Sequence, residues 1–437
     1  MQELGRSVTN GQLLDYRSDI SDLLEQHPTL AKQFDSLRQE LDSPFPSIES
    51  LSHSSIDKQL LIQVAIRRKN KVAKDLDDIL QLIRQEQGFE SFLHAETEEY
   101  FLAAAQEGPI VVLNSTELRT DAILVTKEQV TSIPLQLSHA SVVKYLGTDL
   151  HGGETDLHDN KDKREILRWL WKTTIQPVLQ ELGFYPKPVD PLPWIWWIGV
   201  GLMARAPIHA ATNFKFTQGT IQADMTTVQY CLPSYTSTIR ALQYSRSRQQ
   251  SHQNVSTLIV TMPTTPGETS LKGVSKGADE IQHTLRDFST VTTLQRPTAG
   301  CVLKSLSGYS LAHFACHGIS EINPADSHLL LLRTSIPDDG LCVEAVDKLR
   351  VKDVAALKLP AARLAYLSGC STASSTSPDL ADEATHIASS FHIAGYPHAI
   401  GTLWPAEDEA CQKMAAEFYS TLSKTDDIQA SSTSLYD

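Results

Sequence analysis

The chain has 437 residues, more than one typical domain, and its hydrophobic and charged fractions of 41% and 21% are those of a globular protein with a sizeable core. Its formal net charge of −14 disfavours a nucleic-acid or anionic-membrane surface, because such surfaces need clustered Lys and Arg. Six sparsely spaced cysteines without a C-x-x-C pair disfavour a disulfide framework and indicate a reducing compartment.

The sequence also argues against membrane insertion. Its N-terminus lacks the apolar core of a signal peptide. The most hydrophobic stretch, residues 194–208, is interrupted by Arg205 and Pro207 and is too short to span a bilayer. We therefore expect a cytoplasmic protein that binds neither membrane nor nucleic acid.

Residues 1–105 are predicted to be a helical segment. Apolar residues recur at helical spacing over about 11–42 and again over about 56–87, with charged residues on the opposite face. Pro28 predicts a break in the first helix, and the proline-rich stretch 43–47 ends it. Each helix has one apolar stripe, so each needs a neighbour to bury it.

From residue 106 onward, short β-branched runs alternate with helical patterns. This alternation, with continuous apolar strands, favours an α/β fold with a doubly wound, largely parallel sheet flanked by helices. We expect one domain over 106–437, with a first half at 106–250 and a catalytic half at 251–437. The expected strands are 110–113, 122–125, 193–201, 255–262, 291–294, 310–316 and 364–370, and the expected helices are 161–183, 233–250 and 278–287.

Two strands end in residues suited to thiol chemistry. The run LAHFACHG places His317 and Gly318 at the end of one apolar strand, and LAYLSGC places Gly369 and Cys370 at the end of another. Ligands bind beyond the carboxyl ends of parallel strands, so two such neighbouring strands would bring imidazole and thiol together. An imidazole can take the thiol proton and later protonate a leaving amine. The adjacent glycines allow close backbone approach to a substrate oxyanion.

Each half of this pattern is weak alone, since a cysteine at a strand end is more often buried packing than a nucleophile. The two halves in this order make a cysteine nucleophile a better explanation than packing. An apolar strand ends in His-Gly, about 50 residues follow, and a second apolar strand ends in Gly-Cys. This order and spacing match the arrangement in caspases.

The motifs HFACHG, LSGCST, LADEATHIASSFHIAG and HAIGTLWPAEDEA together resemble a CHAT domain, a member of the caspase and separase superfamily. Further segments before and after residue 106, among them WWIGVGLMARAPIHAA, resemble fungal TPR–CHAT proteins, so the resemblance covers nearly the whole chain. Compared with such proteins the chain looks shortened at both ends.

The resemblance implies a caspase-like cysteine peptidase that needs no cofactor. His317 would be the general acid and base, Cys370 the nucleophile, and the backbones of Gly318 and Cys370 the oxyanion hole. Relatives hold a basic side chain in an acidic pocket, for which Asp379 or Asp408 is the first choice here. The alternative explanation is that carboxylates are stabilised at the start of a helix regardless of function. It applies to four acidic residues, Asp382, Glu383, Glu407 and Asp408.

Other polar residues have simpler explanations. His313 and Cys316 flank His317, but strand alternation sends them to opposite faces, which disfavours a zinc site. His209 lies in a recurring family landmark, APIHAA, and packing is favoured because no nucleophile accompanies it. His386 and His392 are expected on the flanks of an apolar helix. Ser371 and Thr372 either support the nucleophile turn or cap the next segment.

Two functions stay open at this stage. The preferred one is a cysteine endopeptidase acting on a protein or peptide substrate, regulated by a protein that binds the N-terminal helices. The alternative is a catalytically silent scaffold for protein–protein interaction. Nucleotide binding and Ser–His–Asp hydrolysis are disfavoured, because the sequence contains no phosphate-binding loop and no G-x-S-x-G elbow.

Overall fold

The structure, a computed structural model, describes the chain in thirteen pieces: residues 23, 26–42, 55–90, 92, 97–147, 157–217, 220–247, 255–321, 323–335, 343–369, 372–373, 386–404 and 406–435. It forms two compact units whose main spans are Gln12–Thr97 and Glu98–Asp437. Cys370, Asp379, Asp382 and Glu383, together with Ser371, lie outside the described residues.

The first unit contains two helices that bury their apolar stripes against each other. Helix α3 spans Pro28–Asp42 and α4 spans Ser55–Ile83, so the predicted break falls where α3 begins. Phe89 and Phe92 follow α4 and complete a small core, in which the rings of Phe34 and Phe92 meet edge to face at 5.6 Å. The predicted part of the first helix before residue 23 lies outside the described residues.

The second unit begins with a mixed five-stranded sheet in the order β3-β2-β1-β4-β7. Strands β1, β4 and β7 run parallel, whereas β2 and β3 are antiparallel additions, so the first half is less parallel than predicted. The strands are β1 (Ile110–Ser115), β2 (Thr120–Val125), β3 (Val130–Pro134), β4 (Trp194–Gly199) and β7 (Leu232–Tyr235).

Helices cover both faces of this sheet. One core cluster holds Leu170, Trp171 and Trp197, and a second on the other face holds Ala104, Ile198 and Leu242. The helices are α5 (Glu98–Ala104), α6 (His139–Leu146), α7 (Leu157–Leu170), a π-helical turn (Trp171–Ile175), α8 (Gln176–Glu181) and α9 (Ile239–Ser247).

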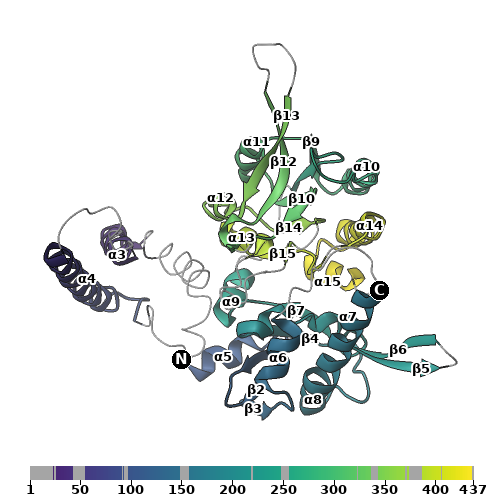
Figure 1. The fold of residues 1–437 in the computed structure, drawn as a ribbon, viewed down its shortest axis with the longest axis horizontal. Coiled ribbons are helices and arrows are strands. Elements are labelled where there is room, and N and C mark those ends of the chain that lie inside the picture. Colours follow the sequence, from purple (N-terminus) through teal and green to yellow (C-terminus); the bar gives the residue numbers. More distant parts are fainter. Residues whose placement is uncertain are drawn as a thin grey trace. The chain divides into compact units, whose positions relative to one another are not determined.

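The helix predicted over 233–250 is wrong at its start. Residues Leu232–Tyr235 form strand β7, and α9 begins only at Ile239. Pro233 explains the difference, because proline tolerates an extended strand start better than the interior of a helix. A two-stranded ribbon precedes β7, formed by β5 (Thr212–Thr217) and β6 (Thr220–Thr226), and it projects from the sheet in Figure 1.

The second sheet is parallel throughout, in the order β15-β14-β10-β8-β9. The chain starts at β8, adds β9 on one side, and then crosses over to add β10, β14 and β15 on the other. Its strands are β8 (Ser256–Thr261), β9 (Thr290–Gln295), β10 (Leu311–Ala315), β14 (Leu364–Leu367) and β15 (His398–Ile400). This arrangement confirms the predicted doubly wound sheet and makes the β8–β10 boundary its switch point.

The helices of this sheet lie on both of its faces. The clusters of buried residues place α10 (Val274–Leu285) and α14 (Asp408–Thr425) on one face. They place α11 (Ala299–Ser305), α12 (Val351–Ala355) and α13 (Ile387–Ala394) on the other, as Figure 1 shows. A short helix, α15 (Ile428–Ser432), follows α14.

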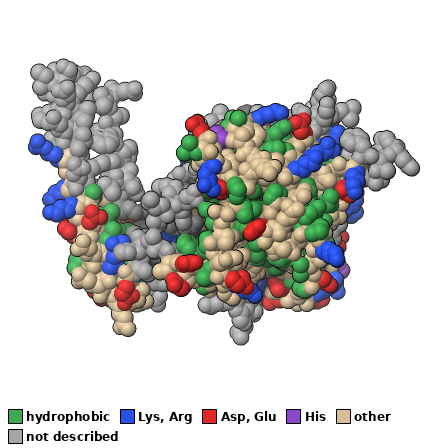
Figure 2. All heavy atoms as spheres, turned by 90° about the horizontal axis from the view of Figure 1, so that it is seen from below, with side chains coloured by type: hydrophobic (Ala, Val, Ile, Leu, Met, Phe, Trp, Pro, Cys, Tyr) green, Lys and Arg blue, Asp and Glu red, His purple; other side chains and the backbone are tan. Residues whose placement is uncertain are grey.

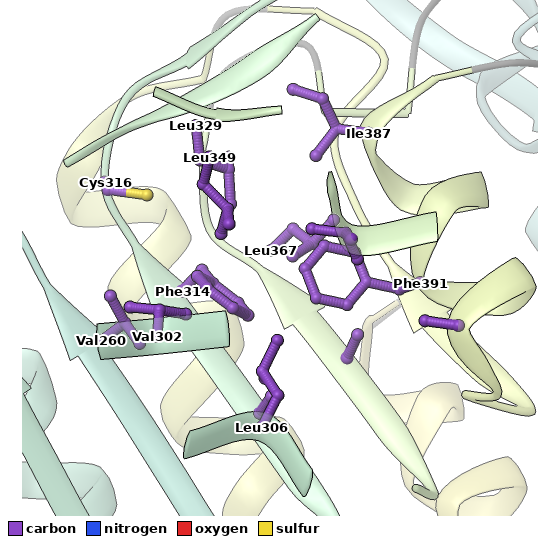
Figure 3. Packing of buried hydrophobic residues seen from close by; sticks show 14 of the residues in the cluster. Val260, Val302, Leu306, Phe314, Cys316, Leu329, Leu349, Leu367, Ile387 and Phe391 are labelled. Atoms are coloured by element: carbon purple, nitrogen blue, oxygen red, sulfur yellow. The ribbon is translucent and has the colours of Figure 1, made fainter. Parts of the chain in front are cut away.

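The larger of these buried clusters sets the register between neighbouring strands of the second sheet. Phe314 of β10 and Leu367 of β14 are paired across the sheet and are both fully buried (Figure 3). The ring of Phe391 on α13 meets Phe314 edge to face at 5.1 Å. Burying such side chains contributes about 2–3 kcal/mol each, so a slip in strand register would be costly.

A smaller antiparallel sheet begins directly after His317. It consists of β11 (Gly318–Ile319), β12 (His328–Ser335) and β13 (Val343–Arg350), and β12 and β13 form a long hairpin that projects in Figure 1. No helix among the described residues is long and apolar enough to cross a membrane. On the face shown in Figure 2, described Lys and Arg side chains lie interspersed with Asp and Glu.

Candidate active site

The two predicted catalytic positions follow two strands that are paired in register. Phe314 pairs with Leu367, and the backbone N–H of Ser368 donates to the carbonyl of Phe314 at 2.8 Å. His317 and Cys370 each stand three residues beyond this pair, past the carboxyl ends of neighbouring parallel strands. The described residues break off after Gly369 and resume at Thr372, so the position of the Cys370 thiol stays a prediction.

Gly369 shows how closely the two strand ends approach. A Cβ atom at this position would lie 2.6 Å from the carbonyl oxygen of Cys316 and 3.4 Å from the nitrogen of Gly318. The residue before Cys370 therefore packs directly on the backbone around His317. Only glycine fits there, because the first of these contacts is with backbone that cannot move aside.

His317 is held at both its backbone and its ring. Its carbonyl accepts a hydrogen bond from Leu330 of β12 at 2.9 Å, and its Nε2 lies 2.8 Å from the carbonyl oxygen of Thr269. A carbonyl only accepts, so Nε2 carries the proton and the neutral ring keeps its lone pair on Nδ1. This tautomer leaves Nδ1 as the nitrogen that can act as a base.

Thr269 belongs to the loop of residues 262–273 that follows β8, beside the switch point of the sheet. The loop is folded on itself, with Leu271 N–H and the Ser270 hydroxyl both donating to the carbonyl of Pro263, at 3.0 and 3.2 Å. Asp408, the first residue of α14, accepts a hydrogen bond from the backbone N–H of Gly273 at 2.8 Å. The loop that orients His317 is thus tied to α14.

The Asp408 carboxylate has a structural partner, and its predicted contact with a basic substrate side chain stays a prediction. The same helix turn also presses on Gly273, where an added Cβ would lie 1.5 Å from Nε2 of Gln412. Glu407 is the residue that precedes α14, in keeping with its helix-start explanation.

Two threonines, Thr372 and Thr402, bind the described residues on either side of Cys370. The Thr402 hydroxyl donates to the carbonyl of Gly369 at 2.7 Å, and its backbone N–H donates to the Thr372 hydroxyl at 3.1 Å. Thr372 is fully buried, and its hydroxyl lies 3.3 Å from the same Gly369 carbonyl. The carbonyl of Thr372 also accepts a hydrogen bond from the backbone N–H of Ala388 at the start of α13, at 2.8 Å, so Thr372 has contacts that fit both explanations.

His313 and Cys316 occupy opposite faces of the second sheet, as predicted. The ring of His313 stacks on Tyr366 at 5.1 Å, and Nδ1 lies 3.3 Å from the Tyr419 hydroxyl. Burial lowers the pKa of His313 to about 3 and raises the pKa of Cys316 to about 12. The described part of the chain contains no group of three or more His, Cys, Asp or Glu residues that could hold a metal ion.

The histidines of α13 serve the helix itself. His386 precedes the helix, and its Nδ1 accepts a hydrogen bond from the backbone N–H of Ser389 at 3.1 Å. Nδ1 of His392 lies 2.9 Å from the carbonyl of Tyr396. Burial lowers the pKa of His386 to about 4 and also lowers the pKa of His392, so both rings are neutral near pH 7.

Sequence reasoning missed two contributors to this site. Thr269 acts through its backbone carbonyl, which every residue possesses, so its side chain carried no signal. Thr402 lies in the GTLWP motif, which was recognised as a family feature without a role for the threonine. A threonine directly after a short strand could have suggested such a role, but not its partner.

Comparison with known proteins adds a family match. Residues 164–433, more than half of the chain, match the CHAT domain family. No curated protein gives a significant match.

Among solved structures, the chain is similar to separase from Saccharomyces cerevisiae, determined in complex with securin, with a TM-score of 0.47 and 10% identity; the match covers 94% of this chain and 38% of the separase chain. It is also similar to a complex of the pro- and mature domains of RgpB from Porphyromonas gingivalis, with a TM-score of 0.33 and 13% identity; this match covers 62% of this chain and 67% of that chain. The chain thus spans well under half of the separase chain.

Proposed function

Because the chain belongs to the CHAT domain family, we propose that it is a caspase-like cysteine endopeptidase in which Cys370 is the nucleophile and His317 the general acid and base. The observation that carries this proposal is the paired register of β10 and β14, because the paired residues Phe314 and Leu367 stand three residues before His317 and Cys370, respectively. Packing of Gly369 against Cys316 and Gly318 supports it from described atoms on both strands.

The first half of the reaction transfers the substrate acyl group to sulfur. Nδ1 of His317 takes the proton of the Cys370 thiol, and the thiolate attacks the carbonyl carbon of the scissile peptide bond. A C–S bond forms while the carbonyl π electrons move to oxygen, and the backbone N–H groups of Gly318 and Cys370 stabilise the oxyanion. When this intermediate collapses, the C–N bond breaks and the His317 imidazolium gives its proton to the leaving amine.

The second half returns the enzyme to its starting state. Nδ1 of His317 takes a proton from a water molecule, and the resulting hydroxide attacks the thioester carbon. Collapse of this second intermediate breaks the C–S bond, releases the carboxylic acid product and returns a proton to sulfur. The Thr269 carbonyl stabilises the imidazolium in both halves, because it lies 2.8 Å from Nε2 and accepts its hydrogen bond.

The substrate and the regulator are the less specific parts of the proposal. A protein or peptide binds at the carboxyl edge of the second sheet, and a carboxylate such as Asp408 holds a basic side chain before the cleaved bond. The helical unit Gln12–Thr97 has a core of its own, which supports a role as the binding surface for a regulatory protein.

A peptide or proteome library incubated with the protein tests the proposal. We expect Cys370→Ala and His317→Ala to abolish cleavage, each lowering the rate by at least about a thousandfold. Cys301→Ala is the matched control, since Cys301 is an exposed free cysteine on α11 and should be dispensable. Cleavage that survives Cys370→Ala would refute the assignment, and a folded protein without any cleavage would favour a silent scaffold.

A further inference from the structure

His209 has no part in the proposed chemistry, yet its ring is fixed on two sides. It lies in a short 3-10 turn, Ile208–Ala210, after β4, close to Tyr235 at the end of β7. The backbone N–H of His209 donates to the Tyr235 hydroxyl at 3.0 Å, and that hydroxyl lies 2.6 Å from Nδ1 of the same histidine. The backbone and the ring of His209 are thus both bound to one hydroxyl, so Tyr235 fixes the orientation of the ring.

The other side of the His209 ring faces the catalytic half of the chain. It stacks on Trp404, with ring centroids 6.0 Å apart and planes 23° from parallel. Trp404 follows strand β15 and stands two residues after Thr402. A residue of the first sheet's half is therefore in contact with the segment that supports the nucleophile turn.

Thr402 carries this contact to the site. Its hydroxyl donates to the carbonyl of Gly369, its N–H donates to Thr372, and its own carbonyl accepts a hydrogen bond from Ala373 at 2.9 Å. These bonds span the turn on both sides of Cys370. Gly401 adds to the constraint, because a Cβ there would lie 2.8 Å from the Thr372 hydroxyl.

From these contacts we propose that His209 is a positioning residue for Cys370. The His209 ring, oriented by Tyr235, packs on Trp404 and keeps it in place. Trp404 in turn positions Thr402, whose hydroxyl binds the carbonyl of Gly369, the residue before Cys370. The inference rests on the proposed function, because it assigns His209 to the same thiol. A direct acid–base role does not suit His209, since burial lowers its pKa to about 4 and leaves the ring neutral near pH 7.

Alkylation of cysteines by iodoacetamide at pH 7, read by peptide mass mapping of the full chain, tests this without any peptide substrate. The rate at Cys370 is divided by the rate at the exposed Cys301 of the same molecule. We expect His209→Ala to lower this ratio by about threefold or more, because misplacing a group by an ångström can cost up to about a hundredfold in rate. His283→Ala, a change at an exposed histidine on α10, is the matched control and should leave the ratio unchanged.

A double-mutant cycle separates positioning from general loosening. Thr402→Val removes the hydroxyl that donates to Gly369 and should lower the ratio by itself. If His209 acts through Thr402, the double variant falls no further than about the larger single effect, whereas independent effects would multiply. A smaller than threefold change in His209→Ala, or multiplying effects in the cycle, would overturn the proposal.

Folding and function can be kept apart in this experiment. If His209→Ala lowers the unfolding temperature markedly, Tyr235→Phe is used in its place, because this change removes only the hydroxyl that orients the ring. The same threefold fall in the alkylation ratio is then required of Tyr235→Phe. Peptide cleavage is measured separately on the same variants. If the substitution leaves the ratio of Cys370 to Cys301 alkylation unchanged, the proposed role of His209 is overturned. If the ratio falls as expected but no peptide is cleaved, only the endopeptidase proposal is refuted.

Discussion

Replacement of Asp408 separates two roles for one carboxylate. In the structure its Oδ2 accepts a hydrogen bond from Gly273 N–H at 2.8 Å, at the end of the loop whose Thr269 carbonyl orients His317. A hydrogen bond to a charged group contributes about 1.5–3 kcal/mol. Because Asp408 is half-buried, we take the lower end, about 1.5 kcal/mol, which corresponds to about a tenfold change in an equilibrium or rate.

The two substitutions Asp408→Ala and Asp408→Asn should therefore differ. Alanine removes the acceptor and is expected to lower kcat by about tenfold and the free energy of unfolding by about 1.5 kcal/mol. Asparagine keeps a carbonyl oxygen that can accept from Gly273, so both values should stay within about threefold and about 1 kcal/mol of the parent. Glu409→Ala is the control, since Glu409 lies beside Asp408 and forms an exposed ion pair with Lys413.

Kinetics on peptides with Lys or Arg before the cleaved bond, together with urea unfolding, distinguish the outcomes. If Asp408 binds the basic side chain of the substrate, the asparagine variant should lose as much as the alanine variant, with the loss in KM. Equal KM defects with an unchanged kcat in both variants would refute the structural role and restore the substrate-binding one.

Three further results are expected from the packing and the charges of the catalytic half. Gly369→Ala should lower the cleavage rate by at least about tenfold, because its Cβ would lie 2.6 Å from the carbonyl oxygen of Cys316; a rate within twofold of the parent would contradict this close approach. Phe391→Ala should lower the free energy of unfolding by about 3–5 kcal/mol, since the ring is fully buried against Phe314, and a loss below about 1 kcal/mol in urea unfolding would contradict the packing. The third result concerns His313, whose pKa of about 3 in the folded protein lies below its ordinary 6.5, so its contribution to stability is full above pH 6.5 and is lost as the pH falls toward 3. Between pH 7 and pH 5, urea unfolding should show a loss of stability that is smaller in His313→Leu than in the parent by up to about 2 kcal/mol, and equal losses in both proteins would contradict it.

The second sheet could be predicted from the sequence because its central strands β8, β10 and β14 are buried on both faces. Runs such as 255–262 and 310–316 are rich in apolar and β-branched residues, and each reappears as a strand within one residue of the expected bounds. The β12–β13 hairpin was missed, although β12 begins with an apolar run. Its partner β13 is mostly exposed or half-buried, so alternating charged residues hide the strand.

The first half was harder for a similar reason. Strand β7 has only four residues and contains Pro233, so the helical pattern that follows it extended over the strand. The antiparallel strands β2 and β3 make this sheet mixed, and nothing in their composition distinguishes the direction in which they run. Strand direction depends on the length of connections and on partners that one sequence does not name.

The site was predictable where chemistry resides in side chains at strand ends. His317 was found because an imidazole follows an apolar strand, and its placement beside the β14 end agrees with the register. The supports of the site were not predictable in this way. The Thr269 carbonyl is common to all residues, and the link between Asp408 and Gly273 joins positions that are 135 residues apart.

These supports converge on one short segment of the chain. Thr402, which holds the carbonyl before Cys370, Trp404, which contacts His209, and Asp408, which ties down the His317 loop, fall within seven consecutive residues. The proposed nucleophile and the proposed base thus have separate supports that meet in a single connection between β15 and α14. A displacement of this connection would disturb both catalytic residues at once, whereas a change in either support alone disturbs only one. Regulation of the proposed peptidase would therefore be most effective at this connection, because a small movement there can misalign sulfur and imidazole together without unfolding the sheet.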